Sequence, residues 1–406
     1  MKILVNCYAC SPYKGSEPGM GWNFVKCLCR LHELHIITES KFQPDLNRYF
    51  EEHPKEKPFY HFYFIEKKRH KKIRKIWPPS YYWFYKVWQK KVLALAKTLD
   101  KKENFDVVHQ LNMVGYREPG YLHEIGKPLI WGPMGGFNIT PWRLLPSMGV
   151  YGILFYGFRN LINLYQMHFS KRVKEAVTKS KMVICATRDD ADALKRLWNK
   201  TGVVIPEVGF TPMPQSTNIA NRAGKLKVCW SGLHIPRKSL NLLLEALAVC
   251  PLKNEIELHV IGEGFCTAKW KRLAEKSQLK NVHWHGWVAR EKALQIMQES
   301  HLFVITSLSD ATSTVLLEAL SLGLPIITLN HLGFSNIVTN GCGIKIDIHS
   351  KQQVVTDIAQ TIESLYHNET ERMRLAQGAL KRSTDFAWEE KAVQISNIYQ
   401  QIAHQL

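Results

Sequence analysis

The stretch SLSDATSTVLLEALSLGLP, residues 307–325, is the part of the sequence that says most about the fold. It follows an apolar run at residues 302–306 and leads, through Gly323 and Pro325, into a second apolar run that ends at Leu329. The residues between the two runs have the composition of a helix that begins near Ser313. A strand, a helix and a strand in this order predict a βαβ unit of a parallel sheet.

The same alternation of short apolar runs and amphipathic segments continues through the chain. It predicts strands at residues 3–6, 35–38, 60–65, 107–109, 129–131 and 182–185, and again at 226–230, 256–261, 282–285, 302–306, 325–329 and 343–346. Residues 210–225 are rich in Pro, Ser, Thr and Asn and read as a linker. We therefore expect an α/β protein with a first doubly wound domain at 1–210, a linker at 211–225, a second domain at 226–385 and a closing helix at 386–406.

Length and composition agree with this division. The chain has 406 residues, and single hydrophobic cores stop growing near ~250–300 residues. No apolar run reaches the ~18 residues of a membrane-spanning helix, and the apolar start of the chain is too brief for a signal peptide. The 9 cysteines, an odd number scattered along the chain, favour reduced thiols. We expect a cytoplasmic protein.

Positive charge is concentrated in the first half of the chain. The formal net charge is +19, of which residues 1–210 carry +16, with 34 Lys/Arg against 18 Asp/Glu. The densest basic segment, residues 67–75, precedes an aromatic segment at 77–88. Such residues could contact nucleic acid or an anionic membrane surface. They could equally form a solvated basic loop before a helix that is packed by its aromatic side chains.

Three residues of the opening stretch could carry chemistry. Asp310 follows a strand, Ser313 lies at the expected start of the helix, and Glu318 lies about one turn inside it. Backbone amides at a helix N-terminus bind anions such as a diphosphate, and a carboxylate nearby can accept two hydroxyls of a ribose. Asp310 and Ser313 could instead be helix caps, but this alternative leaves Glu318 unexplained within an apolar segment.

This pattern resembles glycosyltransferase family 4, the retaining nucleotide-sugar transferases of the GT-B fold. Members carry Glu-x7-Glu followed by Ala-x-x-x-Gly-x-Pro, and this chain has Asp310, Glu318 and then Ala319, Gly323 and Pro325. The resemblance implies two Rossmann-like domains that face each other across a cleft, and a C-terminal helix that returns to the first domain. It also implies donor-sugar contact by Asp310 and ribose binding by Glu318. The backbone amides that would hold the diphosphate are those of Ser313, Thr314 and Val315.

A second segment, residues 230–246, is similar to the family segment whose Arg and Lys neutralise the donor diphosphate. Lys238 matches the family Lys, whereas Leu233 stands at the Arg position. We expect Arg237 to supply part of the missing charge, because a diphosphate leaving group needs cations where its charge develops. Arg237 and Lys238 could otherwise be a solvated helix start, although two cations there oppose the helix dipole.

Two weaker resemblances to the family add residues to the predicted donor side. Gly262 lies in a Gly-x-Gly turn after a strand, and Val288 lies in a segment similar to the one whose backbone meets the nucleotide base. His283 and His285 share one face of a strand, but no third ligand is near in sequence, so we interpret them as packing or solvent residues. The acids at 189–192 suit a first helical turn. No metal is predicted.

In the first half, the segment around Gly15, Ser16 and Glu17 looks like the family's glycine-rich loop, which faces donor and acceptor. We assign Gly15 and Ser16 to donor binding and Glu17 to the acceptor side. His109 is similar to a family histidine near the donor sugar, and it could equally be a satisfied strand-end histidine. A second glycine turn contributes Gly135 and Gly136 to the acceptor side.

Together these features predict a metal-independent glycosyltransferase that transfers a sugar, with retention, from a nucleoside diphosphate donor to a hydroxyl of a lipid-linked glycan. The resemblance places it in cell-surface polysaccharide biosynthesis, with UDP or GDP as the expected nucleotide and no separate cofactor. The basic first half predicts a peripheral protein on the inner face of the cell membrane, with no nucleic-acid partner. A GT-B-like sugar epimerase or phosphorylase, and a nucleic-acid-binding protein, remain as alternatives.

Overall fold

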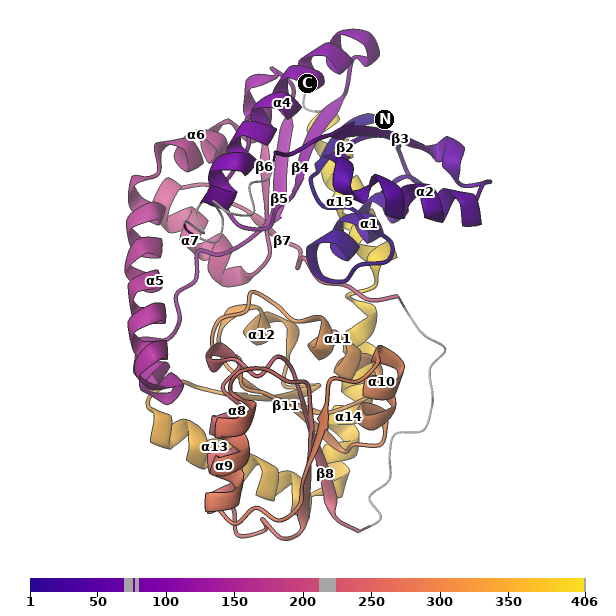
Figure 1. Ribbon diagram of the computed structural model, residues 1–406. Coiled ribbons are helices and arrows are strands. Elements are labelled where there is room, and N and C mark those ends of the chain that lie inside the picture. The colour runs from indigo at the N-terminus through magenta and orange to yellow at the C-terminus, as the bar shows by residue number, and fades with distance from the viewer. Residues whose placement is uncertain (69–75, 77–79, 212–223, 405–406) are drawn as a thin grey trace. The chain divides into compact units, whose positions relative to one another are not determined.

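The computed structural model describes residues 1–68, 76, 80–211 and 224–404, and it divides into two compact units (Figure 1). Unit 1 comprises residues 1–137, 165–209 and 388–406, and unit 2 comprises residues 138–164 and 210–387. Each unit holds one parallel sheet, of 7 strands in unit 1 and 6 in unit 2. Most of the predicted linker, residues 212–223, lies outside the described residues.

Unit 1 contains a parallel sheet in the order β3-β2-β1-β4-β5-β6-β7. Its strands are β1 (Lys2–Cys7), β2 (Glu33–Glu39), β3 (Tyr60–Ile65), β4 (Val107–Asn112), β5 (Leu129–Met134), β6 (Met182–Cys185) and β7 (Val203–Val204). Its helices are α1 (Ser16–Leu28), α2 (Gln43–Glu52), α4 (Ser80–Glu103), α6 (Lys171–Lys179), α7 (Arg188–Trp198) and α15 (Trp388–Ala403), with short 3-10 turns η1 (Ser40–Phe42), η2 (Lys57–Phe59) and η3 (Leu122–Glu124). Every strand predicted for this half is present. Only β7, two residues long, was not expected.

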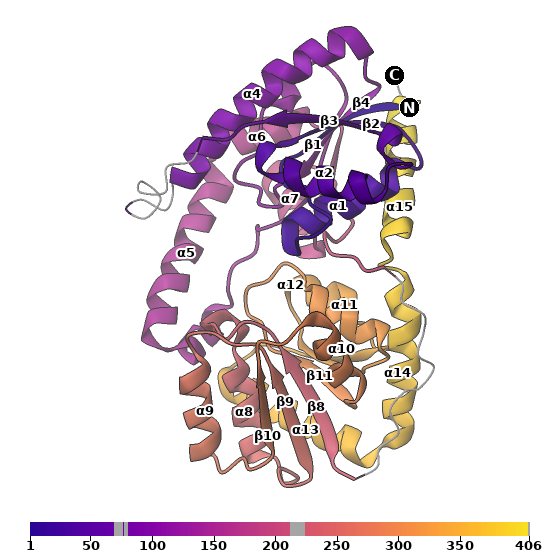
Figure 2. The same cartoon turned by 45° about the vertical axis from the view of Figure 1, so that its right-hand side comes forward.

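Alternate residues of the central strand β1 separate the two faces of this sheet. Ile3 and Val5 pack into one core with residues of α1, α2 and α15, whereas Leu4 packs into the other with Trp88 and Val92 of α4. Figure 2 shows α4 on one side of the strands and α1 with α15 on the other. Both faces are therefore covered, which is why these strands are apolar throughout.

Unit 2 contains the second parallel sheet, in the order β10-β9-β8-β11-β12-β13. Its strands are β8 (Leu226–Ser231), β9 (Ile256–Ile261), β10 (Val282–Gly286), β11 (Leu302–Ile305), β12 (Ile326–Leu329) and β13 (Gly343–Ile346). Its helices are α8 (Leu240–Val249), α9 (Thr267–Lys276), α10 (Arg290–Gln298), α11 (Thr314–Ser321), α12 (Leu332–Ile337), α13 (Lys351–His367) and α14 (Glu369–Thr384), with 3-10 turns η4 (Trp142–Met148) and η5 (Pro236–Lys238). The strands predicted for this half are all present.

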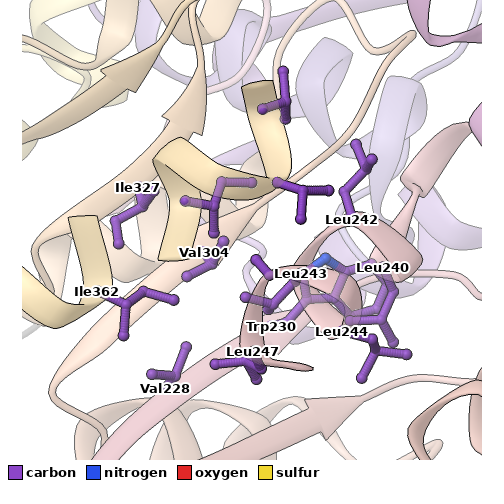
Figure 3. Packing of buried hydrophobic residues seen from close by; sticks show 14 of the residues in the cluster. Val228, Trp230, Leu240, Leu242, Leu243, Leu244, Leu247, Val304, Ile327 and Ile362 are labelled. Carbon is purple, nitrogen blue, oxygen red and sulfur yellow. The ribbon is translucent and has the colours of Figure 1, made fainter. Parts of the chain in front are cut away.

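The core of unit 2 is built on α8, whose residues are buried nearly all round. Leu240, Leu243 and Leu247 pack with Trp230 of β8 and Ile362 of α13, as Figure 3 shows from close by. A short helix that is apolar on all sides is stable only when other elements surround it. Here α13 and α9 both contact α8.

The change from unit 1 to unit 2 falls between Gly209 and Phe210, next to the predicted boundary, but one earlier segment is assigned differently from the prediction. The segment 138–164, which includes η4 and the first part of helix α5 (Gly149–Phe169), belongs to unit 2. Leu144, Leu145, Met148 and Tyr156 are buried in the unit 2 core. The burial of these side chains explains why the segment belongs to unit 2. The sequence did not indicate this, because a linker composition near residue 210 does not tell where an earlier segment packs.

The C-terminal helix α15 packs into unit 1. Its Trp388 ring lies 5.1 Å from that of Phe24 on α1. The ammonium of Lys391 is buried and donates hydrogen bonds to the carbonyl oxygen of Pro206, at 2.6 Å, and to that of Val208. Burial lowers the pKa of Lys391 to about 7. This lysine ties α15 to the end of the preceding unit 1 segment.

The described part of the basic and aromatic segment is partly buried, whereas Tyr82 and Trp83 of α4 are 42% and 56% exposed. Lys67 is buried, with its ammonium 2.9 Å from the Tyr8 hydroxyl and 3.6 Å from the centre of the Tyr81 ring. Tyr85 and Trp88 of α4 lie in the core. Residues 69–75 and 77–79 are outside the described residues. Of the three interpretations, the helix packed by its aromatics therefore fits Tyr85 and Trp88, which are closed to bases and lipids alike.

Replacing Lys391 tests the anchoring of α15. Lys391→Met keeps much of the side-chain volume but leaves the two buried carbonyls without this donor, so we expect a loss of about 1–3 kcal/mol in the free energy of unfolding. Chemical denaturation would measure it. Gln394→Met, an exposed position on the same helix, is the control and should change stability by less than about 0.5 kcal/mol. Equal effects of the two substitutions would contradict the anchoring role.

Candidate functional site

The carboxyl ends of four neighbouring strands gather the candidate residues of unit 2. The backbone amide of Gly232, after β8, donates to Ile261 at the end of β9, and Gly262 donates to Gly286 at the end of β10. Ser307 follows β11, the neighbour of β8 on its other side. Ligands of open parallel sheets bind at this edge.

Asp310 is the centre of a cluster of three charges. Its carboxylate lies 2.5 Å from the ammonium of Lys238 and contacts the guanidinium of Arg237. It also accepts a hydrogen bond of 2.6 Å from the Ser307 hydroxyl. Two cations and one carboxylate leave one net positive charge. Asp310 is thus an ion-pair partner rather than a helix cap.

The turn η5 places both cations on this loop. The backbone N–H of Leu308 donates to the carbonyl of Arg237 at 2.7 Å, and the Thr306 hydroxyl donates to that of Lys238 at 2.9 Å. These two bonds join η5 to the end of β11. Neighbouring residues 237 and 238 therefore both reach Asp310, which lies 72 positions after Lys238.

Burial changes the proton affinity of the lysine. Its side chain is 14% exposed, and burial together with the neighbouring Arg237 lowers the pKa of Lys238 to about 8. Burial also lowers the pKa of the Arg237 guanidinium, which nevertheless keeps its charge at neutral pH. Lysine at this position is charged at pH 7 and loses its charge in the weakly alkaline range.

Helix α11 adds its N-terminus to the same loop. Ser313 is the N-cap residue in an extended conformation, and its side chain makes no capping hydrogen bond. Thr314 and Val315 are the first two residues of the helix, and such first-turn N–H groups have no acceptor within the helix. With a net positive charge beside them, they complete an environment that favours an anion.

Glu318 has a partner that the sequence did not indicate. Arg290, the first residue of α10, places both its Nε and an Nη atom 2.8 Å from Glu318 Oε1. The Glu318 side chain is 13% exposed, so this ion pair accounts for an acid within an apolar helix. Val288 lies half-buried two residues before Arg290. The ion pair thus connects Glu318 to the segment that holds Val288, and both are predicted donor-binding residues.

Gly262 is needed where the chain passes very close to a neighbouring loop. Its φ is +113°, and a Cβ atom there would lie 2.1 Å from the carbonyl oxygen of Gly232. Only glycine permits both the conformation and the approach. The turn after β9 is therefore pressed against the loop that leads from β8 to η5.

The acceptor-side candidates of unit 1 lie together. The carboxylate of Glu17 accepts a hydrogen bond of 2.7 Å from the backbone N–H of Val114, whose carbonyl accepts one of 2.8 Å from Gly135. Gly136, the next residue, has a φ of +100°. Gly15 and Ser16 are exposed at the start of α1, directly before Glu17. Segments near residues 15, 114 and 135 are thus joined.

His109 is enclosed in the core of unit 1. Its side chain is fully buried, with Nδ1 hydrogen-bonded to the Tyr399 hydroxyl at 2.5 Å and Nε2 to the Gly132 carbonyl at 2.7 Å. Burial lowers the pKa of this imidazole to about 4. Both ring nitrogens are occupied, so His109 matches the satisfied strand histidine and not the catalytic one.

Two cations of the site were missed from the sequence. Arg290 pairs with Glu318 as described, and Arg159 of α5 donates a hydrogen bond of 3.3 Å to the Ser309 hydroxyl beside Asp310. For Arg290 the available signal was a cation just ahead of a helical segment. For Arg159 the sequence carried none, because residues 138–164 were assigned to the other domain.

Comparisons with known proteins show which family and which fold this chain resembles. Residues 215–382 match the family model "Glycosyl transferases group 1". The chain is 26% identical over 216 residues to the phosphatidylinositol N-acetylglucosaminyltransferase GPI3 subunit of Saccharomyces cerevisiae, a match covering 50% of this chain and 46% of the relative. It is 30% identical over 165 residues to the lipopolysaccharide glucosyltransferase WaaG of Escherichia coli, covering 40% of this chain and 39% of that one. The chain thus spans about half the length, or less, of these curated relatives.

A solved structure extends the likeness in fold to the whole chain. Alr3699/HepE of Anabaena, in complex with UDP, superposes with a TM-score of 0.63 at 16% identity, covering 99% of this chain and all of that one. Its fold is the two-domain α/β arrangement known as GT-B. Residues 215–382 of this chain thus match the glycosyl transferases group 1, and they do so within a chain that has the GT-B fold.

Proposed function

We propose that this chain is a retaining, metal-independent glycosyltransferase that moves a sugar from a nucleoside diphosphate donor to a hydroxyl of a glycan. The observation that carries the proposal is the cluster of Arg237, Lys238 and Asp310 beside the N-terminus of α11. Its net positive charge suits the diphosphate leaving group. The complex of HepE with UDP supports a nucleotide-sugar donor, with UDP or GDP expected here.

Each charged group has a distinct part in the proposed reaction. Lys238, Arg237 and the first amides of α11 stabilise the negative charge that develops on the departing diphosphate, a contribution realised only as the glycosidic bond breaks. Asp310 keeps the two cations in place before the donor arrives and meets the donor sugar. Glu318 accepts the ribose hydroxyls, for which Arg290 orients its carboxylate. The departing phosphate takes the acceptor proton, so the reaction needs no protein base.

The acceptor is proposed to be a lipid-linked glycan of cell-surface polysaccharide biosynthesis. The relatives named for lipopolysaccharide and phosphatidylinositol support an acceptor of this class. In unit 1, the joined loops that hold Glu17, Gly135 and Gly136 are the proposed acceptor side.

A peripheral location on the inner face of the membrane is supported by α5. Within the described residues, no helix is long and apolar enough to cross a membrane. The unit 2 part of α5 nevertheless exposes large apolar side chains at helical spacing, namely Val150, Tyr151, Leu154, Phe155, Phe158 and Leu161, each between 49% and 74% exposed. The whole helix contains no acidic residue. The membrane contact that the first domain was expected to make is therefore proposed for this helix, and the net charge of +19 of the chain favours an anionic surface.

The donor site is tested by removing one charge at a time. Glu318→Ala and Lys238→Ala should each lower kcat/KM at least ~100-fold, the scale of losing one contact that stabilises developing charge. Products from a panel of UDP-, GDP- and ADP-sugars with lipid-linked acceptors would be identified by mass spectrometry. Lys276→Ala, an exposed lysine at the end of α9, is the matched control.

Near-wild-type turnover in either variant would contradict the assigned site. Epimerised donor without transfer would favour the epimerase alternative. Salt-sensitive binding of oligonucleotides that survives Glu318→Ala would favour the nucleic-acid-binding one.

The pKa of Lys238 predicts how donor binding depends on pH. Because this pKa is near 8, the lysine is charged at pH 7, and its protonated fraction falls to about a tenth at pH 9. Calorimetry of UDP binding should therefore show affinity falling between pH 7 and pH 9. Lys238→Arg, which stays charged throughout this range, should bind with little change. A flat profile in the wild type would contradict the role of this lysine.

Liposome flotation tests the α5 surface. The wild type should float with vesicles that contain anionic lipid and remain behind with purely zwitterionic ones. The double variant Leu154→Glu/Phe158→Glu should lose at least about tenfold in binding, since each apolar side chain contributes about 1.5–3 kcal/mol when buried. Phe59→Glu, a similarly exposed aromatic position on η2, is the control. Equal binding to both kinds of vesicle would refute the preference for anionic lipid.

A further inference from the structure

Four potential metal ligands share one face of the sheet edge in unit 2. Strands β9 and β10 pair in parallel with His259 opposite His283. Glu257 lies two residues before His259 and His285 two residues after His283, and residues two apart on a strand point to the same face. The pairing therefore brings a carboxylate and three imidazoles together. The sequence alone offered only the two histidines of β10.

Three of these side chains are within coordination reach of one another. Glu257, His259 and His283 each offer one ligand atom, and these atoms all lie within 4.8 Å of one another. The rings of His259 and His283 are stacked at 4.9 Å between centroids. A tetrahedral zinc ion with bonds of about 2.0–2.2 Å would be reached by small rotations of these side chains.

His259 is held in place by the fourth residue. Its Nδ1 lies 3.0 Å from Nε2 of His285, within hydrogen-bond distance. When Nδ1 carries the proton of this bond, the lone pair of His259 is on Nε2. Histidines that bind metals characteristically donate their other N–H to a neighbouring acceptor, which fixes the tautomer and the ring orientation.

The Nε2 atom of His259 is buried and has no hydrogen-bond partner in the described part of the chain. The nearest carboxylate oxygen, Oε2 of Glu257, is 3.9 Å away, which is too far for a hydrogen bond. A buried nitrogen without a partner costs free energy.

A comparable cluster in unit 1 shows what a satisfied arrangement looks like. Glu33, His35 and His61 also bring their ligand atoms within 4.8 Å. There, however, Nδ1 of His35 is 3.0 Å from the Tyr63 hydroxyl and Nε2 is 3.2 Å from the Glu33 carboxylate. Both nitrogens of His35 are occupied. The two clusters have the same composition, and only the one in unit 2 leaves a buried lone pair unused.

We propose that Glu257, His259 and His283 bind a divalent transition-metal ion, zinc by the chemistry of the ligand set, with His285 orienting His259. Two imidazoles and one carboxylate form a set that zinc accepts, with a water molecule at the fourth position. The ion sits on the body of the strands and takes no part in sugar transfer. Its effect is to fasten β10, which pairs with β9 alone among the described strands, to the rest of the sheet.

A metal ion at this site would also affect the segment after β10, which holds the predicted donor-binding residue Val288. His285 is followed directly by Gly286, whose carbonyl accepts a hydrogen bond of 2.8 Å from Gly262, and then by the segment that holds Val288. An ion between β9 and β10 would therefore restrain the start of that segment.

The test measures bound metal and does not depend on transferase activity. The untagged full chain is incubated with zinc, dialysed and analysed for metal, and about one ion per chain is expected. His259→Ala and His283→Ala should each abolish retention, and His285→Ala should weaken zinc binding by about 10–100-fold. His61→Ala, which removes a histidine from the unit 1 cluster, is the matched control and should retain zinc as the wild type does.

A cobalt-loaded sample identifies the ligands, because the chain also has 9 cysteines that could hold zinc. Ligation by imidazole and carboxylate gives the visible bands of tetrahedral cobalt without the intense near-ultraviolet band of cobalt–thiolate bonds. Zinc should also raise the Tm of the wild type and not that of His259→Ala. Three outcomes would overturn the proposal: no zinc in the wild type, unchanged zinc in His259→Ala, or a thiolate spectrum.

Discussion

Burial of the central strands of two parallel sheets on both faces is the constraint on which the rest of this protein depends. The central strand β1 sends Ile3 and Val5 to one core and Leu4 to the other, so neither face of such a strand is open to a ligand. Functional side chains are left with the loops at the strand ends and with partly exposed edge strands such as β10. Because all strands of a sheet run the same way, the loops that follow β8, β9, β10 and β11 meet at one edge. The charged cluster of unit 2 is a consequence of this geometry.

The charges at that edge are arranged so that the cluster is stable without a ligand and still favours an anion. A lone carboxylate or a lone cation in a half-buried loop would be costly, and Asp310 shared between Arg237 and Lys238 avoids both. The net positive charge of the cluster lies beside the N-terminus of α11, which is the positive end of the helix dipole. In the proposed reaction, an arriving diphosphate would replace solvent around groups that are already oriented, which is the physical basis of electrostatic stabilisation in an enzyme.

Several apolar side chains of α5 remain largely exposed in the described part of the chain. The same helix buries Tyr156 in the core of unit 2 and exposes Val150, Leu154 and Phe158. A helix with one face in a core and a second apolar face in water is stable only because the first face outweighs the cost of the second. Such a surface is typically covered by a partner, and a membrane surface is the partner proposed for it here.

The sequence by itself determined the secondary structure and part of the site. Apolar runs of strand length and the helices between them follow from local composition, so the predicted strands reappear in the structure. Glu318 stood out as an acid within an apolar helix and Asp310 by its place after a strand, whereas Lys238 was assigned by its resemblance to a segment of glycosyltransferase family 4. Only the tertiary structure decided that Arg290 pairs with Glu318, that Arg159 from α5 reaches the Asp310 loop, and that His109 is fully enclosed. It also brought Glu257 and His259 beside the histidines of β10. These outcomes depend on which strands are neighbours and on what fills the space between helices. Strand neighbours and packing are set by contacts between residues far apart in the chain, and local periodicity does not record them.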